Sequence, residues 1–145
     1  GNLAAWNYFQ SVDNPTNKTF VEQWKAYAKA HKLPNADTAV TNDPMEATWV
    51  GMHMWAQAVE KAKSTDVDKV RAAMAGQTYP APSGFTLTMD KTNHHLHKPV
   101  MIGEIEANGQ FNVVWQTDTP IRAQPWSPFI AGNDKKPDHP VKSTQ

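Results

Sequence analysis

Apolar residues recur at helical spacing along three stretches of the chain. The first helix is predicted to begin after Asn14, which can cap free amides, with Pro15 at the first helical position, and to end near His31. Its apolar positions form one stripe, comprising Phe20, Val21, Trp24, Tyr27 and Ala28. Because charged residues occupy positions between them, this stretch is predicted to be an amphipathic helix with one face on a core.

The second stretch is apolar around most of its circumference. Asp43 is expected to cap it, with Pro44 at the first helical position and Glu46 reaching back to the amide of Asp43. One stripe comprises Met45, Trp49, Met52, Ala56 and Val59, and further apolar positions are Val50, Met54, Trp55 and Ala58. Since these positions exceed a single face, we expect the helix to be covered on more than one side.

A third helix and a strand follow. The helix is predicted to begin at Thr65, with Asp68 as its capping partner, and to stop at Gly76. The residues that it is expected to bury are Val67, Val70 and Met74. Residues 84–89 then alternate between apolar and polar, which predicts a strand. The apolar face of this strand comprises Phe85, Leu87 and Met89.

Residues 100–106 and 110–116 form a predicted β-hairpin, and the apolar pattern decides its register. A two-residue Asn108-Gly109 turn would mix apolar and polar residues on each face. A three-residue loop over 107–109, with Gly109 in the left-handed conformation, separates them instead. The cross-strand pairs that this loop predicts are Ile105 with Phe111, Gly103 with Val113, and Met101 with Trp115.

Composition limits the classes of partner. The chain has 145 residues, which suits a single domain, and its 14 Lys and Arg residues balance 14 Asp and Glu residues. Without excess positive charge for phosphate, nucleic acid is not expected as a partner. No apolar run approaches the roughly 20 residues of a membrane-spanning helix. The lack of cysteine excludes disulfides and cysteine zinc sites.

A run of histidines over 92–97 is the most conspicuous chemical motif. His95 and His97 would project to the same side of an extended segment, as two metal ligands could. Asp90 is the nearby carboxylate, no cysteine completes a ligand set, and Pro99 makes the segment a loop. Hydrogen-bonded loop histidines are therefore the preferred interpretation, and a metal-dependent hydrolase is kept only as a hypothesis for comparison.

No residue meets the requirements of a catalytic group. Ser83 precedes Gly84 but lacks the flanking glycines and apolar strand of a nucleophile elbow. Glu104 and Glu106 alternate along a strand, where solvated glutamates are the ordinary expectation. We therefore predict that the protein is not an enzyme and has no catalytic residue, no metal site and no cofactor.

Aromatic residues gather immediately before the first helix. Trp6, Tyr8 and Phe9 lie with Asn7 at a junction between a strand and a helix, where ligand clefts of α/β sheets commonly lie. Amphipathic aromatic rings can wall a small polar ligand and offer it an N–H or O–H group. The alternative interpretation, which the sequence leaves open, is that these residues belong to the core of a buried strand.

Five segments of the chain together resemble a known family. They are AWNYFQSVD over residues 5–13, NDPMEA over 42–47, APSG over 81–84, TNHHLHKP over 92–99 and PIRAQPW over 120–126. This set resembles the C-terminal third of the substrate-binding proteins of urea and short-chain amide ABC transporters. These are type I periplasmic binding proteins, a group that also includes branched-chain amino acid binders and cytoplasmic amide sensors. The resemblance covers about residues 1–129.

The resemblance implies an α/β fold in which the chain is a C-terminal fragment of a two-lobed type I periplasmic binding protein, with three helices plus a β-hairpin. Residues 1–130 would contribute to both lobes, and residues 131–145 are expected to be a disordered polar tail. We expect the chain to be a piece of something longer, whose N-terminal part supplies the remaining ligand contacts. The ligand-binding candidates are Trp6 and Tyr8, followed by Met45 and Glu46.

The function that the resemblance implies is that of a solute receptor in the periplasm. It would bind a small polar solute, urea or a short amide, and deliver it to an ABC permease in the membrane. The alternative is a cytoplasmic amide-sensing regulatory protein of the same fold, whose closure acts on a protein partner. Because a urea-sized ligand needs polar groups from both lobes, the fragment alone is not expected to bind it.

Overall fold

The computed structural model describes residues 1–138 of the protein, which form three α-helices and two small antiparallel sheets. The helices are α1 (Pro15–Ala30), α2 (Asp43–Ala62) and α3 (Val67–Met74). The strands are β1 (Leu3–Trp6), β2 (Thr78–Pro80), β3 (Thr86–Met89), β4 (Leu96–His97), β5 (Met101–Ile105) and β6 (Phe111–Gln116). Two short 3₁₀ turns are η1 (Ala36–Thr38) and η2 (Asn133–Lys135). Within the described residues, no helix is long and apolar enough to cross a membrane.

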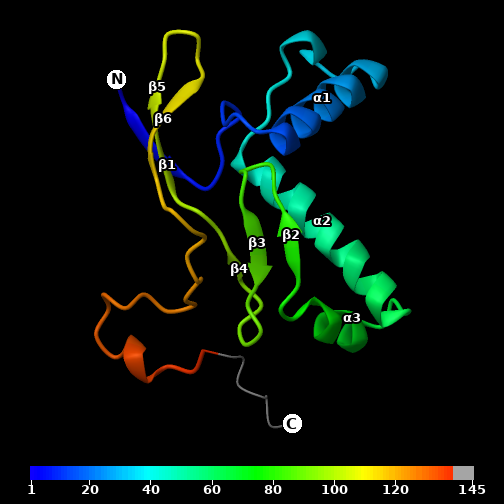
Figure 1. Ribbon diagram of the computed structural model, residues 1–145, viewed down its shortest axis with the longest axis vertical. Helices are drawn as coiled ribbons and strands as arrows, with labels where there is room; N and C mark the ends of the chain where they lie inside the picture. Colours follow the sequence, from blue (N-terminus) through cyan, green and yellow to red (C-terminus); the bar gives the residue numbers. More distant parts are fainter. Residues whose placement is uncertain (139–145) are drawn as a thin grey trace.

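The two sheets belong to two spatially separate groups of elements (Figure 1). Sheet A has the strand order β1-β5-β6, and sheet B has the order β2-β3-β4 and lies beside the helices. The chain leaves sheet A after β1, builds α1 to β4, and then returns to sheet A for β5 and β6. This is the mixed α/β architecture, with three helices and a hairpin, that the sequence predicts.

Residues 7–14 and 98–100 connect the two groups, and residues 117–121 run beside them from β6 to residues 122–138. We call these three the crossing segments. Hydrogen bonds tie them to one another. The side-chain amide of Asn7 donates to the carbonyl of Pro99 over 2.6 Å, and the amide of Thr117 donates to the carbonyl of Val100 over 2.9 Å. The amide of Ile121 donates to the carbonyl of Lys98, also over 2.9 Å. The connection between the groups is thus a small hydrogen-bonded unit rather than a set of independent linkers.

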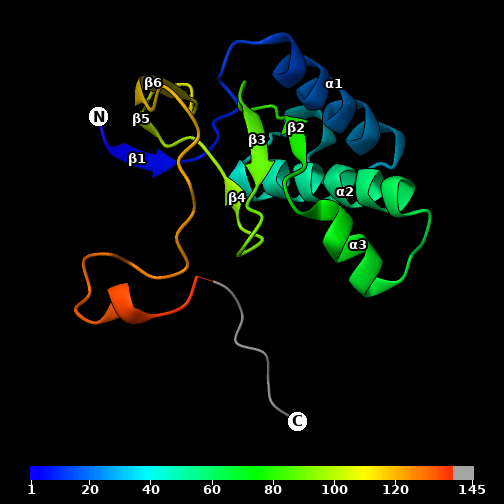
Figure 2. The same ribbon diagram turned by 60° about the horizontal axis from the view of Figure 1, so that its bottom comes forward.

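The core lies between α2, sheet B and α3, as Figure 2 shows from a second direction. Its main cluster comprises Val50, Met54, Ala81 and Leu87, and a second cluster comprises Ala58, Val70 and Ala73. Complete burial of a Val, Leu or Met side chain stabilises the fold by about 1.5–3 kcal/mol before conformational entropy is subtracted. The strand predicted over 84–89 is confirmed as β3, with Leu87 fully buried.

The start of α1 is as predicted, whereas the caps of α2 and α3 each lie one position away from the expected residue. Asn14 accepts a hydrogen bond from the amide of Asn17 at the start of α1. At α2 the capping side chain is Asn42 rather than Asp43, and at α3 it is Asp66 rather than Thr65. In both helices the neighbouring residue is an equally good cap, and the turn geometry decides between them.

The buried face of α2 differs from the predicted stripe. It comprises Glu46, Val50, Met54 and Ala58, each four residues from the next. Met52 and Trp55 are 59% and 45% exposed. The predicted apolar stripe was wrong because Glu46 was assigned to the helix cap. The buried row that begins at Glu46 was therefore not identified as the buried face. In α3, Val70 and Ala73 are buried as part of the core, while Val67 is exposed.

The register of the β5–β6 hairpin is confirmed over its outer half. Ile105 pairs with Phe111 and Gly103 pairs with Val113, and Gly109 adopts the predicted left-handed conformation with φ of 79°. Nearer the crossing segments a bulge between Ile102 and Gly103 shifts the register, so Met101 pairs with Gln116 rather than Trp115. Such a bulge adds one residue to one strand and has no local sequence signal here.

Part of the predicted polar tail is included in the described residues. Asn133–Lys135 forms η2, and the side chain of Asn133 is buried and donates to the carbonyl of Ser127 over 2.9 Å. Residues 139–145, the remainder of the predicted tail, lie outside the described residues, and their disorder stays a prediction.

Candidate functional site

The first crossing segment carries Tyr8, which is 1% exposed and joins three parts of the chain. Its hydroxyl donates to Oδ1 of Asn17 on α1 over 2.7 Å and lies 2.7 Å from the hydroxyl of Thr41, just before α2. Burial raises the pKa of Tyr8 to about 12, and the hydrogen bond with Thr41 opposes this effect. Tyr8 is thus buried, although it follows β1 rather than lying in a buried strand, and it also lines a cavity.

This cavity has a volume of about 210 Å³ and lies between sheet A and the start of α2. Its aromatic walls are Trp6, Tyr8, Phe9 and Phe111, and its polar lining is Gln10, Thr41, Asn42, Asp43 and Gln110. The ring centroids of Phe9 and Phe111 are 4.8 Å apart, and those of Trp6 and Phe9 are 6.4 Å apart. Trp6 itself is 45% exposed. Two of the four predicted ligand-binding residues, Trp6 and Tyr8, therefore line one cavity.

Glu46 does not reach back to Asp43 as a capping residue, because its side chain is fully buried and turned towards the second crossing segment. There the ammonium of Lys98 donates to Oε2 of Glu46 over 2.8 Å and lies 3.9 Å from Oδ1 of Asp43. Burial raises the pKa of the Glu46 carboxyl, and the charge of Lys98 partly offsets the effect. The pair connects α2 with the crossing segments.

Met45 is half-buried in the first turn of α2, where its amide donates to Oδ1 of Asn42 over 3.0 Å. Neither Met45 nor Glu46 lines the 210 Å³ cavity, which reaches α2 through Asn42 and Asp43. Sequence reasoning missed Asp43 as a lining residue because a capping role already explained it. It missed Lys98 because nothing local connects that residue with Glu46, 52 positions away.

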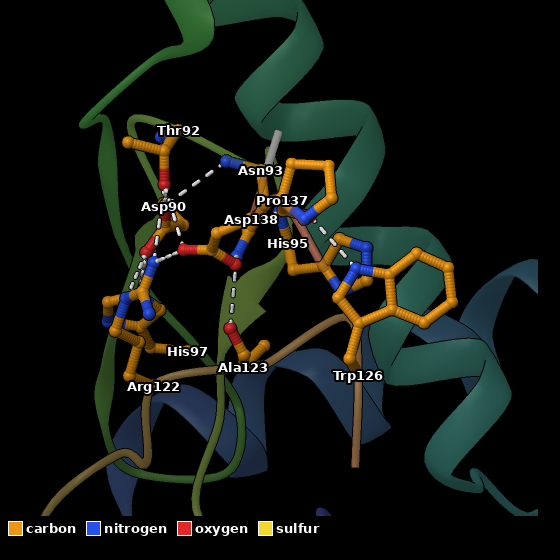
Figure 3. A network of polar contacts seen from close by, with 10 residues as sticks. All are labelled: Asp90, Thr92, Asn93, His95, His97, Arg122, Ala123, Trp126, Pro137 and Asp138. Carbon is orange, nitrogen blue, oxygen red and sulfur yellow. Dashed lines mark hydrogen bonds and ion pairs between the residues drawn. The ribbon is translucent and has the colours of Figure 1, made fainter. Parts of the chain in front are cut away.

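One residue of the histidine run, His97, belongs to a polar network around Asp90 rather than to a set of metal ligands (Figure 3). Oδ2 of Asp90 lies 3.0 Å from Nε2 of His97 and accepts from Nε of Arg122 over 2.8 Å. The hydroxyl of Thr92 donates to Oδ1 over 2.6 Å. These hydrogen bonds, that of Thr92 foremost, hold the pKa of Asp90 well below its usual range. His97 is hydrogen-bonded as expected but lies in β4 rather than in a loop. His94, which does lie in a loop, has its Nε2 3.2 Å from the carbonyl of Arg71.

The same network holds residues 122–138, which we call the C-terminal segment. Arg122 forms an ion pair with Asp138 at the far end of this segment, and Asn93 donates to both the Ala123 carbonyl and Asp138 over 3.1 Å (Figure 3). The indole N–H of Trp126 donates to the Pro137 carbonyl over 2.9 Å. Over residues 1–138, no three His, Asp or Glu side chains lie close enough together to hold a metal ion.

Comparison with known proteins places the chain in a family. Residues 1–131 match the family model described as periplasmic binding protein domain, and the chain therefore belongs to this family. The match covers both sheets, all three helices and the crossing segments. The fold is thus that of a part of a periplasmic binding protein.

Solved structures share this fold. A solute-binding protein of an ABC transporter from Rhodopseudomonas palustris BisB5, in complex with 3,4-dihydroxybenzoic acid, matches with a TM-score of 0.68 and 22% identity, over 83% of this chain and 31% of its own. A related protein from strain HaA2, in complex with p-hydroxybenzoic acid, matches with a TM-score of 0.65 and 22% identity, over 83% of this chain and 32% of its own. An ABC-type branched-chain amino acid transporter protein from strain CGA009 matches with a TM-score of 0.52 and 24% identity, over 83% of this chain and 31% of its own. The chain thus spans about a third of the length of these proteins.

One curated relative has the name of an enzyme rather than of a transport protein. A protein named limonene hydroxylase from Geobacillus stearothermophilus is 36% identical over 125 residues, which are 86% of this chain and 21% of that protein. The shared region is a fifth of the relative, so its name describes a much longer protein. The absence of enzymatic activity in our chain stays a prediction.

Proposed function

We propose that the chain acts as part of the solute-binding component of an ABC importer, completed by further polypeptide into two lobes. The observation that carries this proposal is the 210 Å³ cavity, whose lining comes from sheet A on one side and from the start of α2 on the other. A solute in this cavity would contact both groups of elements. Binding would therefore depend on the angle between the groups, which is the requirement for a receptor that closes over its ligand.

The proposed ligand is urea or a short amide, as the sequence resemblance implies. The cavity is smaller than the roughly 300–1,000 Å³ of drug-sized ligand sites. A urea-sized solute of about four heavy atoms gains at most about −6 kcal/mol, which corresponds to tens of micromolar. Such a ligand is held only if its polar groups are all paired in a dry site, which supports contacts from both lobes.

Aromatic acids are the second candidate, because two of the similar structures contain hydroxybenzoic acids. The aromatic walls of the cavity would suit a ring. The charges favour the neutral solute, since the cavity lining among the described residues includes Asp43 but no Lys or Arg. A carboxylate ligand would face this negative charge.

The proposed partner is an ABC permease, and the proposed location is the periplasm or the outer face of the cell membrane. The solved relatives of this fold are transport proteins, which supports the receptor over the cytoplasmic amide-sensing regulator. Export distinguishes the two, because only the transport protein has to leave the cytoplasm. Cell fractionation of the full-length protein is the corresponding test.

Isothermal titration calorimetry of the full-length binding protein tests the proposal. Urea, acetamide, 4-hydroxybenzoate and leucine form the ligand panel, and we expect saturable heat with urea or acetamide. Residues 1–145 alone are expected to give none. Trp6→Ala should weaken binding about tenfold or more because it removes a wall of the cavity. The matched control Trp126→Ala, in the C-terminal segment, should leave the affinity unchanged. Saturable binding of leucine or 4-hydroxybenzoate alone would contradict the amide assignment, and no binding to the whole panel would contradict the receptor.

A further inference from the structure

Buried side-chain atoms without hydrogen-bond partners concentrate at one place in the molecule. Five such atoms occur among the described residues, and three of them are Oδ1 of Asp43, Oε1 of Glu46 and Oγ of Ser83. The backbone amide of Ser83 faces the Glu46 carboxyl, and the charge of Asp43 acts on it from the same turn of α2. With Lys98, whose ammonium reaches both carboxylates, these residues form what we call the Lys98 cluster: Asp43, Glu46, Ser83 and Lys98.

The burial of this cluster makes its unpaired atoms informative. Glu46 is 0% exposed and Ser83 is 3% exposed, so bulk water does not complete their hydrogen bonds. Buried polar atoms in native proteins are nearly always paired, because an unpaired one has lost its hydration without compensation. The unpaired oxygens of the two carboxylates next to the Lys98 ammonium and the unpaired hydroxyl of Ser83 are therefore available to hydrogen-bond a further polar group.

Charge restricts the chemistry of that group. Nζ of Lys98 lies 2.8 Å from Oε2 of Glu46, so a metal cation would meet a positive charge at the place where it needs ligands. An anion would meet the carboxylates of Asp43 and Glu46. A neutral molecule with several N–H donors and one carbonyl matches the free atoms, since carboxylate oxygens only accept, whereas Ser83 and Lys98 can donate.

The cluster also adjoins the proposed solute site. Asp43 lines the 210 Å³ cavity, and Ser83 lines a larger groove of about 710 Å³ between β6 and the start of α1. Glu46 lines neither space, but it is linked to Asp43 through Lys98 and to the backbone of Ser83. The cluster thus adjoins the cavity through Asp43.

We propose that the Lys98 cluster is the polar end of the solute site and binds the amide group of a small neutral amide or urea. Amide N–H groups donate to the free oxygens of Asp43 and Glu46, and the carbonyl accepts from Ser83 or Lys98. This proposal rests on the proposed function. It assigns to Glu46 a direct contact with the solute in addition to its ion pair.

The test uses full-length protein and calorimetry with urea and acetamide, alongside thermal melting. Ser83→Ala removes only an unpaired hydroxyl, so we expect the affinity to fall about tenfold, the effect of one lost hydrogen bond, with an unchanged melting temperature. Glu46→Gln should also weaken binding, and Asp43→Asn provides a third variant should Glu46→Gln not fold. The matched control is Gln77→Leu, which removes another buried unpaired oxygen outside the cluster and should leave the affinity unchanged.

The outcomes separate the two proposals. Wild-type affinity for amides in Ser83→Ala and Asp43→Asn would overturn the cluster assignment while leaving the receptor function intact. The same holds if a high-resolution structure of the amide complex shows only ordered water among these residues. Failure of the wild-type protein to bind any solute of the panel would overturn both proposals. A loss of affinity confined to the cluster variants, with unchanged stability, supports the assignment.

Discussion

Replacing Tyr8 with phenylalanine should destabilise the protein at neutral pH and remove part of its sensitivity to alkali. The variant leaves Oδ1 of Asn17 and the hydroxyl of Thr41 without the donor or acceptor that Tyr8 supplies over 2.7 Å. Loss of a buried partner of this kind costs about 1–3 kcal/mol. At pH 7 we therefore expect the free energy of unfolding of Tyr8→Phe to lie below that of the wild type by this amount.

The alkaline behaviour follows from the pKa of Tyr8, which burial raises from 10.0 to about 12. Between these values the unfolded chain releases the phenolic proton and the folded chain keeps it, so the wild type loses stability as the pH rises. At pH 11 this loss is about 1.4 kcal/mol relative to pH 7. The variant has no phenol at this position, so the difference between the two proteins should shrink by that amount.

Guanidinium chloride unfolding at pH 7 and pH 11, followed by tryptophan fluorescence, measures both effects. Other titrating groups are common to the two proteins, so the difference between them reports on Tyr8. Tyr27→Phe, at a position 54% exposed, is the matched control and should change stability at pH 7 by less than about 0.5 kcal/mol. An equal stability difference at pH 7 and pH 11 would refute the buried, hydrogen-bonded role of Tyr8.

Three further substitutions test the packing and the polar network. Gly103→Ala should lower the free energy of unfolding by about 1–3 kcal/mol, because a Cβ there would lie 2.7 Å from the ring of Phe9. Gly51→Ala, in α2 with nothing within 4 Å, should instead raise it by about 0.5–1 kcal/mol; equal melting temperatures for the two would contradict this packing. Asp90→Asn should speed tryptic cleavage of the C-terminal segment by weakening its hold on Arg122. Because the pKa of Asp90 is lowered in the folded state, the wild type should lose the same stabilisation as the pH falls below about 4. Tryptic cleavage that depends neither on pH nor on this substitution would contradict the role of Asp90 in holding the C-terminal segment.

Local signals in the sequence predicted the three helices, β3 and the β5–β6 hairpin, but not the short strands β2 and β4. Asn14 followed by Pro15 is a start signal that needs no tertiary information, and α1 begins at Pro15. The alternation of apolar residues predicted the pairs of Ile105 and Gly103 across the hairpin. The bulge beyond Gly103 was not predictable, because no local sequence signal marks it.

The candidate site was predictable only in its aromatic part. Trp6 and Tyr8 precede the start signal of α1 in the sequence, and both line the cavity. The polar part depends on residues far apart in the sequence, since Glu46 is buried through an ion pair with Lys98. A buried carboxylate in the first turn of a helix has the same local pattern as a capping residue, so only the tertiary contact distinguishes them.

Small-angle X-ray scattering of the full-length protein tests the central claim most directly, namely that the two groups joined by the crossing segments close over a solute. We predict that saturating acetamide or urea lowers the radius of gyration of the wild type, and that Ser83→Ala requires a higher concentration for the same change. Scattering that is unchanged at a ligand concentration shown by calorimetry to saturate the protein would contradict the account.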